Sequence, residues 1–336
     1  MSDSFPDIKS IVIKVITDKP VRKTPYQVKG VFMRQFPDET IVPMLNGSLR
    51  DKFLYPRVQV KILNEQIFII GINEGIEPVL KLAEKFKAFD FGNITFEIES
   101  YEVEESENQF IPSKKLLKYK FVTPWVALNH MTGGKYRFLG SQEKPSFLNK
   151  LIGQNIVFLA NELGVKLSDD IFTRVSLSSF SPESVDDNKW GAFMGVFETN
   201  FILPNYIGVG NGITRGFGTI FGVFNQDKFS FNETKTEEGL SDEPLIIEEQ
   251  KDLETISTLN VKKPKRKNII ENKVDSRKKN NKPIKNKSRS FKKTKKIFSE
   301  EFDIEETNIN LKSDVIDEAD DQNFNTEKHH KKQHKF

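Results

Sequence analysis

The chain has 336 residues and a formal net charge of +3, with 51 Lys and Arg against 48 Asp and Glu. This length suits two or three domains. It contains no cysteine, which excludes disulfides and thiolate chemistry. No apolar run approaches the ~20 residues of a membrane span, and the first residues do not resemble a signal peptide. We therefore expect a cytoplasmic protein without membrane contact.

Charge is divided unevenly along the chain. Residues 1–225 are close to neutral, whereas the rest consists of acidic, basic and again acidic stretches. In the basic block, 261–298, only Glu271 and Asp275 carry negative charge. Such a composition cannot bury enough apolar surface to offset its ordering entropy, so we predict a disordered tail at 226–336. Its basic block either contacts RNA phosphates or serves as a solvated linker.

The first part of the chain alternates between strand and helix patterns. Short apolar runs predict strands, and apolar residues spaced by three and four predict helices. In chain order these are a strand at 11–16, a helix at 25–36, strands at 58–63 and 67–72, a helix at 74–87 and a strand at 93–103. The βαββαβ order is that of the ferredoxin-like fold. We expect the last strand to return to the middle of the sheet, both helices to cover one face, and the other face to be open for binding.

A charged stretch at 102–112 marks a boundary, after which a second set of elements begins. These are a strand at 116–122, a helix at 146–163 ended by Gly164, a long hairpin at 173–180 and 191–203, and a last strand at 219–224. We predict an α+β protein with two tandem ferredoxin-like domains, at 1–110 and 111–225, followed by the tail.

Residues 208–222 read GVGNGITRGFGTIFG and hold six of the 19 glycines: Gly208, Gly210, Gly212, Gly216, Gly218 and Gly222. Glycine permits positive φ and bare backbone N–H groups, which together with Arg215 suit a phosphate backbone. The segment is either such a nucleic-acid cradle or a glycine-rich hairpin before the last core strand. Its spacing matches neither the dinucleotide fingerprint nor a P-loop.

Four segments together resemble a known family. They are LYPRVQVKILNEQIFIIGINEG at 54–75, FVTPWVALN at 121–129, the helix that follows, and GVGNGITRGFGTI. In order and spacing they are similar to the CRISPR-associated endoribonucleases that process repeat RNA, in the subgroup typical of subtype I-B systems. The resemblance covers most of residues 10–224 and none of the tail.

This resemblance implies tandem RNA-recognition-like domains of the ferredoxin-like type, with RNA bound across the cleft between them. It also implies cleavage without metal or cofactor, in which the 2′-hydroxyl attacks the neighbouring phosphate and leaves a cyclic phosphate. The enzyme must align the reacting atoms, move two protons and neutralise charge. RNA and other proteins of an effector complex are the partners it implies.

The chain departs from the family at the loop after the first helix, where relatives usually carry histidines. Residues 41–56 contain none, and Asn46 and Ser48 stand in their place. Neither side chain can transfer a proton near pH 7, as histidine can. Tyr55 remains where the subgroup has a tyrosine.

The resemblance and the residue types give Tyr55, Arg34, Lys52 and His130 as candidate catalytic residues. Tyr55 would order the 2′-hydroxyl, helped by Arg34, Lys52 or Arg57. His130, the one histidine before the tail, is either a relocated acid or base or a hydrogen-bonded surface residue at a strand end.

The candidate RNA contacts are basic residues and the glycines themselves. Arg215 can form a forked contact with a phosphate or a guanine edge. Phe217 either stacks on a base or anchors the glycine-rich segment. The full predicted set is Gly208, Gly210, Gly212, Arg215, Gly216, Gly218, Lys118, Lys120, Lys135 and Arg137.

Three functional hypotheses follow. The first is a slow ribonuclease, because losing a general acid or base costs about 10²–10⁴-fold in rate. The second is a protein that binds a hairpin RNA without cutting it. The third is a structural component of a ribonucleoprotein.

Overall fold

The computed structural model describes residues 7–107, 109–167, 170–185, 190–224 and 254–256. The predicted tail at 226–336 therefore lies outside the described residues, except for the short strand at 254–256. Within the described ranges, no helix combines the length and the apolar composition needed to cross a bilayer.

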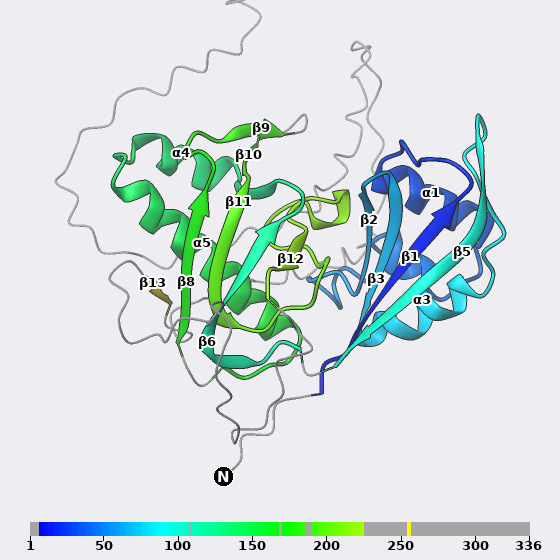
Figure 1. Cartoon of the computed structure of the whole chain (residues 1–336), viewed down its shortest axis with the longest axis horizontal. Coiled ribbons are helices and arrows are strands. Elements are labelled where there is room, and N and C mark those ends of the chain that lie inside the picture. The colour runs from blue at the N-terminus through cyan, green and yellow to red at the C-terminus, as the bar shows by residue number, and fades with distance from the viewer. Residues whose placement is uncertain (1–6, 108, 168–169, 186–189, 225–253, 257–336) are drawn as a thin grey trace, which may run out of the picture. The chain divides into compact units, whose positions relative to one another are not determined.

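The N-terminal domain follows the predicted order of strands and helices, with three short additions (Figure 1). The prediction missed α2, η1 and β4, each of four residues or fewer, because such short elements carry no measurable periodicity. The elements are β1 (Ser10–Thr17), α1 (Pro25–Gln35), α2 (Val42–Leu45), β2 (Val58–Leu63), β3 (Gln66–Ile72), the 3-10 turn η1 (Asn73–Gly75), α3 (Ile76–Ala83), β4 (Ala88–Asp90) and β5 (Thr95–Ser106).

Local signals fix the ends of these elements. α1 begins with a capping box, in which the Gln27 amide donates to Thr24 Oγ1 (3.2 Å) and the Thr24 amide donates to Gln27 Oε1 (2.9 Å). Pro25 occupies the first helical position, where its missing N–H costs nothing. Between β2 and β3, Asn64 (φ 49°) and Glu65 (φ 58°) both adopt the left-handed conformation that a two-residue hairpin turn requires.

The N-terminal sheet has the strand order β2-β3-β1-β5-β4. The prediction that the last long strand returns to the middle of the sheet needs correction. β5 pairs with β1 through Ile13 and Val103, and its outer side is covered only by the three-residue β4. The antiparallel pairing of β1 with both β3 and β5 puts β1 rather than β5 at the centre.

One face of this sheet is covered as predicted, and the other is not open. Ile13 is buried with Val28 of α1 and Leu82 of α3 in one core cluster. On the opposite face, Phe68 belongs to the larger cluster that holds the core of the C-terminal domain, and its ring lies 5.0 Å from that of Tyr206. The predicted open binding face is therefore occupied by the protein's own side chains.

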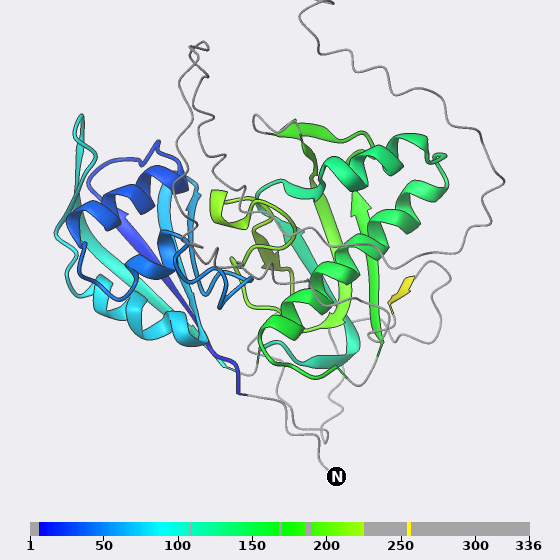
Figure 2. The same ribbon diagram turned by 180° about the vertical axis from the view of Figure 1, so that it is seen from behind.

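The C-terminal domain contains a main sheet, a small second sheet and two helices (Figures 1 and 2). Its elements are β6 (Pro112–Phe121), β7 (Trp125–Leu128), α4 (His130–Phe138), α5 (Glu143–Glu162), β8 (Ile171–Leu177), β9 (Glu183–Val185), β10 (Trp190–Phe193), β11 (Gly195–Phe201), the 3-10 turn η2 (Ile213–Arg215), β12 (Ile220–Gly222) and β13 (Glu254–Ile256).

The two domains share one strand order, which confirms the predicted α+β fold of two tandem ferredoxin-like domains. The main C-terminal sheet reads β12-β6-β11-β8-β13, and the small sheet reads β7-β10-β9. Without β4 and β13, each main sheet is ordered second, third, first, fourth along its own chain segment. α5 follows the first strand, and the glycine-rich segment stands where the second helix of a ferredoxin-like domain would be.

α5 supplies the core of the C-terminal domain. It ends as predicted, with Gly164 in the left-handed conformation (φ 80°) just after the helix. It begins earlier than predicted, at Glu143. Its buried apolar residues include Leu148, Leu151, Ile152, Ile156 and Leu159.

Three residues of the predicted tail form part of this domain. β13 pairs antiparallel with β8, with Thr255 opposite Phe172. Ile256 is 7% exposed and packs against Gly153 of α5, where an added Cβ would lie 2.3 Å from Ile256 Cγ1. The prediction of disorder is wrong for these residues, because burial of one isoleucine on a glycine has no signature in local composition.

Candidate functional site

The glycine-rich segment, residues 208–222, is mostly buried, and many of its amides donate hydrogen bonds within the protein. The Gly208 amide donates to Gln59 Oε1 (2.8 Å), the Val209 amide to Gly218 O (2.9 Å) and the Gly218 amide to Pro124 O (2.9 Å). These N–H groups cannot at the same time form the bare anion cradle suggested by composition. The segment is a folded loop around η2 that leads into β12.

Close packing explains why glycine is needed at two of these positions. At Gly218 (φ 64°) an added Cβ would lie 1.9 Å from the carbonyl oxygen of Val209. At Gly210 (φ 89°) it would lie 2.7 Å from Trp125 Nε1. Positive φ and the absence of a side chain are both used to fold the loop on itself.

The loop is held by a row of polar side chains, of which the sequence analysis named Tyr55 and Arg57 for catalysis but placed neither under the loop. Tyr55, Arg57, Gln59 and Lys61 occur at alternate positions, so they share one side of β2 and the residues before it. All four are buried. The Tyr55 hydroxyl donates to Gly208 O (3.0 Å), and Lys61 Nζ donates to Ile213 O (3.1 Å).

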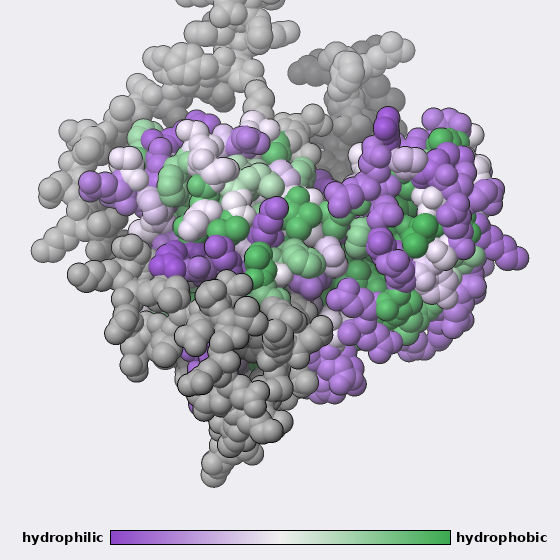
Figure 3. All heavy atoms as spheres, in the orientation of Figure 1, coloured by the Kyte–Doolittle hydropathy of each residue, from purple (hydrophilic) through white to green (hydrophobic). Residues whose placement is uncertain are grey.

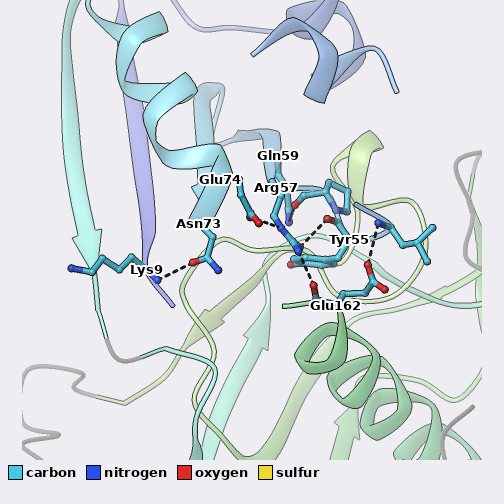
Figure 4. Close-up of polar contacts among 9 residues, drawn as sticks. Lys9, Tyr55, Arg57, Gln59, Asn73, Glu74 and Glu162 are labelled. Atoms are coloured by element: carbon cyan, nitrogen blue, oxygen red, sulfur yellow. Dashed lines mark hydrogen bonds and ion pairs between the residues drawn. The ribbon is translucent and has the colours of Figure 1, made fainter. Parts of the chain in front are cut away.

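Arg57 extends this row to the end of α5 (Figure 4). Its guanidinium donates to Glu162 O (2.7 Å), to Tyr55 O (3.2 Å) and to the carboxylate of Glu74 (2.9 Å). A cation at the C-terminus of a helix satisfies its last carbonyls and complements the helix dipole. The Leu54 amide donates to the Glu162 carboxylate (3.1 Å), so Glu162 contacts the segment before β2 twice.

Burial changes the acid–base properties of two members of the row. Burial, together with the smaller effect of the Lys29 charge, lowers the pKa of Lys61 to about 7. Burial raises the pKa of Tyr55 above its ordinary value. Lys61 can therefore lose its proton near neutral pH, whereas Tyr55 stays protonated.

Of the four predicted catalytic residues, Lys52 and Tyr55 lie in the segment before β2, whereas Arg34 and His130 lie on two other elements. Among the described residues, no hydrogen bond or ion pair joins any two of the four. Tyr55 is 1% exposed and its hydroxyl is used by Gly208. Arg34, in the last turn of α1, donates to the carbonyl of Asp90. Lys52 is exposed, with its ammonium 5.0 Å from the Phe53 ring. His130 is the exposed first residue of α4.

The start of α1 lies beside the glycine-rich loop and carries residues that sequence reasoning missed. An added Cβ at Gly216 would lie 2.8 Å from Pro25 Cγ. The next residue, Tyr26, is 67% exposed, and Lys29 Nζ lies 5.4 Å from its ring centroid. An exposed phenol, a lysine and the loop thus meet at one place. A single tyrosine at a helix start has no pattern that would distinguish it in the sequence.

Two predicted residues, His130 and Arg137, line one cavity of about 500 Å³ between α4 and the small sheet. Trp190 of β10 also lines it, and Arg215 Cζ lies 5.2 Å from the Trp190 ring. The guanidinium of Arg215 is also 5.8 Å from the Phe217 ring. Phe217 is half-buried and packs against the cluster that contains Trp190, which matches an anchoring role.

The other predicted basic residues are exposed on two different elements. Lys118 and Lys120 lie on one side of β6, as their even spacing implied. Lys118 is opposite Glu198 of β11, whose carboxylate pairs with Arg174 of β8. Hydrophilic residues gather over β8 and β11 on the face seen in Figure 3. Lys135 is in α4 but does not line the cavity.

The chain matches models of both halves of one family. The Cas6b N-terminal domain matches residues 6–109, and the Cas6b C-terminal domain matches residues 111–223. An uncharacterized protein of Methanocaldococcus jannaschii is 31% identical over 117 residues, which are 34% of this chain and 78% of that protein.

Solved structures give the same result. A crystal structure of Cas6b is 29% identical, with a TM-score of 0.55, over 65% of this chain and 100% of that one. A crystal structure of the CRISPR RNA processing endoribonuclease Cas6b is 25% identical, with a TM-score of 0.50 and the same coverage. Together with the two domain models, these matches show that the chain belongs to the Cas6b family.

Proposed function

We propose that the chain is an endoribonuclease that binds and cleaves CRISPR repeat RNA. The observation that carries this proposal is the match of both domains to Cas6b, including a solved relative described as a CRISPR RNA processing endoribonuclease. Association with other proteins of an effector complex and a cytoplasmic location stay predictions.

The proposed reaction is a metal-independent transesterification. The 2′-oxygen attacks the adjacent phosphorus in line, and the bond from phosphorus to the 5′-oxygen breaks. A base takes the 2′-hydroxyl proton and an acid gives one to the departing 5′-oxygen, leaving a 2′,3′-cyclic phosphate and a 5′-hydroxyl. Alignment, proton transfer and neutralisation of the charged phosphorane are the contributions required of the protein.

We place the scissile phosphate where α1 begins beside the glycine-rich loop. Tyr26 offers the exposed phenol that buried Tyr55 does not, and it can hold the 2′-hydroxyl by a hydrogen bond. Lys29 is buried beside the Tyr26 ring, so it adds positive charge near the phosphorane without contacting it. Tyr55 becomes a positioning residue, because its hydroxyl holds Gly208 in place. Lys52 and His130 are both exposed and remain candidates for proton transfer.

RNA contacts away from the cleaved bond come from the exposed basic residues. Lys118 and Lys120 present two charges on one side of β6, and Lys135 and Arg137 lie in the last turn of α4. Each can neutralise a phosphate, and affinity should then fall steeply with salt. Arg215 joins the two regions, since it lies over Trp190 in the loop that reaches α1.

A second function, RNA binding without cleavage, is favoured by the loop that lacks histidine. Asn46 and Ser48 are exposed, and the Ser48 hydroxyl donates to Asn46 Oδ1 (2.6 Å). Neither group exchanges a proton near neutral pH. On this hypothesis the fold and the basic surface are retained and the chemistry is lost.

One experiment separates the two functions. The full chain is incubated with 5′-labelled CRISPR repeat RNA in EDTA, and the products are resolved on a denaturing gel. The proposal expects one cut with a cyclic-phosphate end, slowed about 10²-fold or more in Tyr26→Phe. Tyr101→Phe, another exposed tyrosine, serves as the matched control. Intact RNA that is nevertheless retarded on a native gel would establish the second function instead.

A further inference from the structure

The cavity beside α4 is formed by one side of that helix and the small sheet. His130, Gly133, Gly134 and Arg137 all line it. Their spacing of three, four and seven residues places them on one side of a helix. The adjacent side of α4 holds exposed Met131, so the helix turns only part of its surface to the cavity.

The helix is fixed in this orientation by its cap and by its buried side. Asn129 Oδ1 accepts hydrogen bonds from the amides of Met131 (2.9 Å) and Thr132 (3.0 Å). The Tyr136 hydroxyl donates to Phe180 O (2.7 Å), which ties α4 to the segment before β9. The cavity wall is therefore set before any ligand enters.

The lining has the composition of a site for an anion with a flat apolar part. Its walls include Leu128, Tyr136 and Trp190, and its ionisable cationic groups are His130 and Arg137. No acidic residue is found among the described residues that line it. Bare glycine backbone at Gly133 and Gly134 permits close approach. Pockets of about 300–1,000 Å³ accommodate ligands of drug or nucleotide size.

The cavity is also connected to the proposed cleavage point. Trp190 lines it and lies under Arg215, and the next residue in the loop, Gly216, contacts Pro25 at the start of α1. A single RNA strand that follows these contacts passes from the cavity, over Arg215, to Tyr26. The basic, partly aromatic lining and this route together fit a nucleic-acid strand.

We infer that the cavity binds one nucleotide of the RNA beside the cleaved bond, with its base against the apolar wall and its phosphate at Arg137 and His130. This inference rests on the proposed RNA function and gives it a specificity site. Base stacking and a charge-assisted hydrogen bond to arginine are the interactions that hold the nucleotide.

The test uses the tryptophan fluorescence of the full chain and the four ribonucleoside 5′-monophosphates as probes. The chain has two tryptophans, of which Trp125 is fully buried and Trp190 is 5% exposed at the cavity. We expect saturable quenching by at least one nucleotide and loss of that quenching in Trp190→Phe. Arg137→Gln should lower the affinity for the nucleotide about tenfold, as expected for the loss of one charged hydrogen bond. Lys87→Gln, which removes an exposed cation of the N-terminal domain, should leave the nucleotide affinity unchanged.

A second variant keeps the test independent of charge. An added Cβ at Gly134 has nothing within 4 Å, so Gly134→Leu fits the helix and fills the cavity. It should abolish quenching while the melting temperature is kept or raised, because leucine favours helix over glycine.

The inference would be overturned by unchanged quenching in Gly134→Leu, by quenching that persists in Trp190→Phe, or by inorganic phosphate binding as tightly as every nucleotide. Saturable nucleotide binding in a chain that does not cut RNA would support the cavity and reject cleavage. RNA cleavage without nucleotide binding would support the proposed function and reject the cavity. Failure of the proposed function and failure of the inference therefore give different results.

Discussion

Lys61 Nζ donates to the carbonyl oxygen of Ile213, 3.1 Å away, so a buried lysine of the N-terminal domain holds the 3-10 turn of the glycine-rich loop. The lysine is fully buried and has no carboxylate partner among the described residues; its acceptor is a neutral carbonyl. Two forces then oppose one another: the hydrogen bond favours the ammonium, and burial disfavours it. The loop is anchored through a group whose charge depends on pH.

Stability should rise with pH between about 7 and 9.5. Burial, with the charge of Lys29, lowers the pKa of Lys61 from 10.5 to about 7, so in this window the unfolded chain binds a proton that the folded chain has lost. The free energy of unfolding then increases with pH, by at most about 1.4 kcal/mol per pH unit. Lys61→Met should flatten this dependence, as measured by urea denaturation at pH 7, 8 and 9. Lys87→Met removes an exposed charge and should leave the pH dependence of stability as it is in the wild type. Parallel curves for wild type and Lys61→Met would contradict the assignment.

Tyr55→Phe should destabilise the protein by about 1–3 kcal/mol, since it leaves the buried carbonyl of Gly208 without its donor. The ring packing is retained, so the loss reports the hydroxyl alone. Thermal and urea unfolding measure it, with Tyr101→Phe as a control at an exposed site. Because the proposed role is positioning, RNA cleavage should fall less than in Tyr26→Phe. A variant as stable as wild type but without activity would instead restore Tyr55 as a catalytic residue.

Gly218→Ala should be among the most damaging single-methyl changes in the chain. The new Cβ meets a backbone oxygen at 1.9 Å, and φ is 64°. We expect a loss well above the ~1–2 kcal/mol of a left-handed alanine. Gly92→Ala provides the comparison, because Gly92 also has positive φ (86°) but nothing within 4 Å. Equal unfolding midpoints for the two variants would show that the loop can move aside.

We predict that β13 protects the edge of the C-terminal sheet formed by β8. Gly153→Ala places a methyl group 2.3 Å from Ile256 Cγ1, and Ile256→Ala removes the side chain that packs there. Both should speed amide hydrogen exchange in β8, because the covering strand is released. Exchange in β11, which lies on the other side of β8, should stay slow. Unchanged exchange in β8 for both variants would mean that β13 does not protect this edge.

The fold was predictable where apolar residues recur at the regular spacing of a strand or a helix. β1, β2, β3, α1 and α5 agree with prediction to within a few residues. α4 was missed because its sequence, HMTGGKYRF, contains two glycines that weaken the helix signal. His130 and Arg137 were selected separately, and only α4, which was not predicted, shows that they share one side of a helix.

The candidate site was less predictable, because burial of polar residues is not visible in local sequence. VQVKIL in β2 alternates as a strand with one solvated side would, yet Gln59 and Lys61 are buried under the loop. Composition left two roles open for the glycines, an amide cradle for phosphates and a packed hairpin, and the structure shows a packed loop. In each case the deciding partner lies about 150 residues away, as the separation of 149 between Gly208 and Gln59 illustrates.

Neither side of β2 therefore tolerates a change in residue pattern. Its Val58 and Val60 side chains belong to the N-terminal core, and its alternate residues carry the polar row that holds the loop. A shift of one residue in its pairing would exchange the two sets, placing a lysine in the apolar core and a valine under the loop. An insertion or deletion between Tyr55 and Leu63 should therefore disturb both the N-terminal core and the packing of the glycine-rich loop.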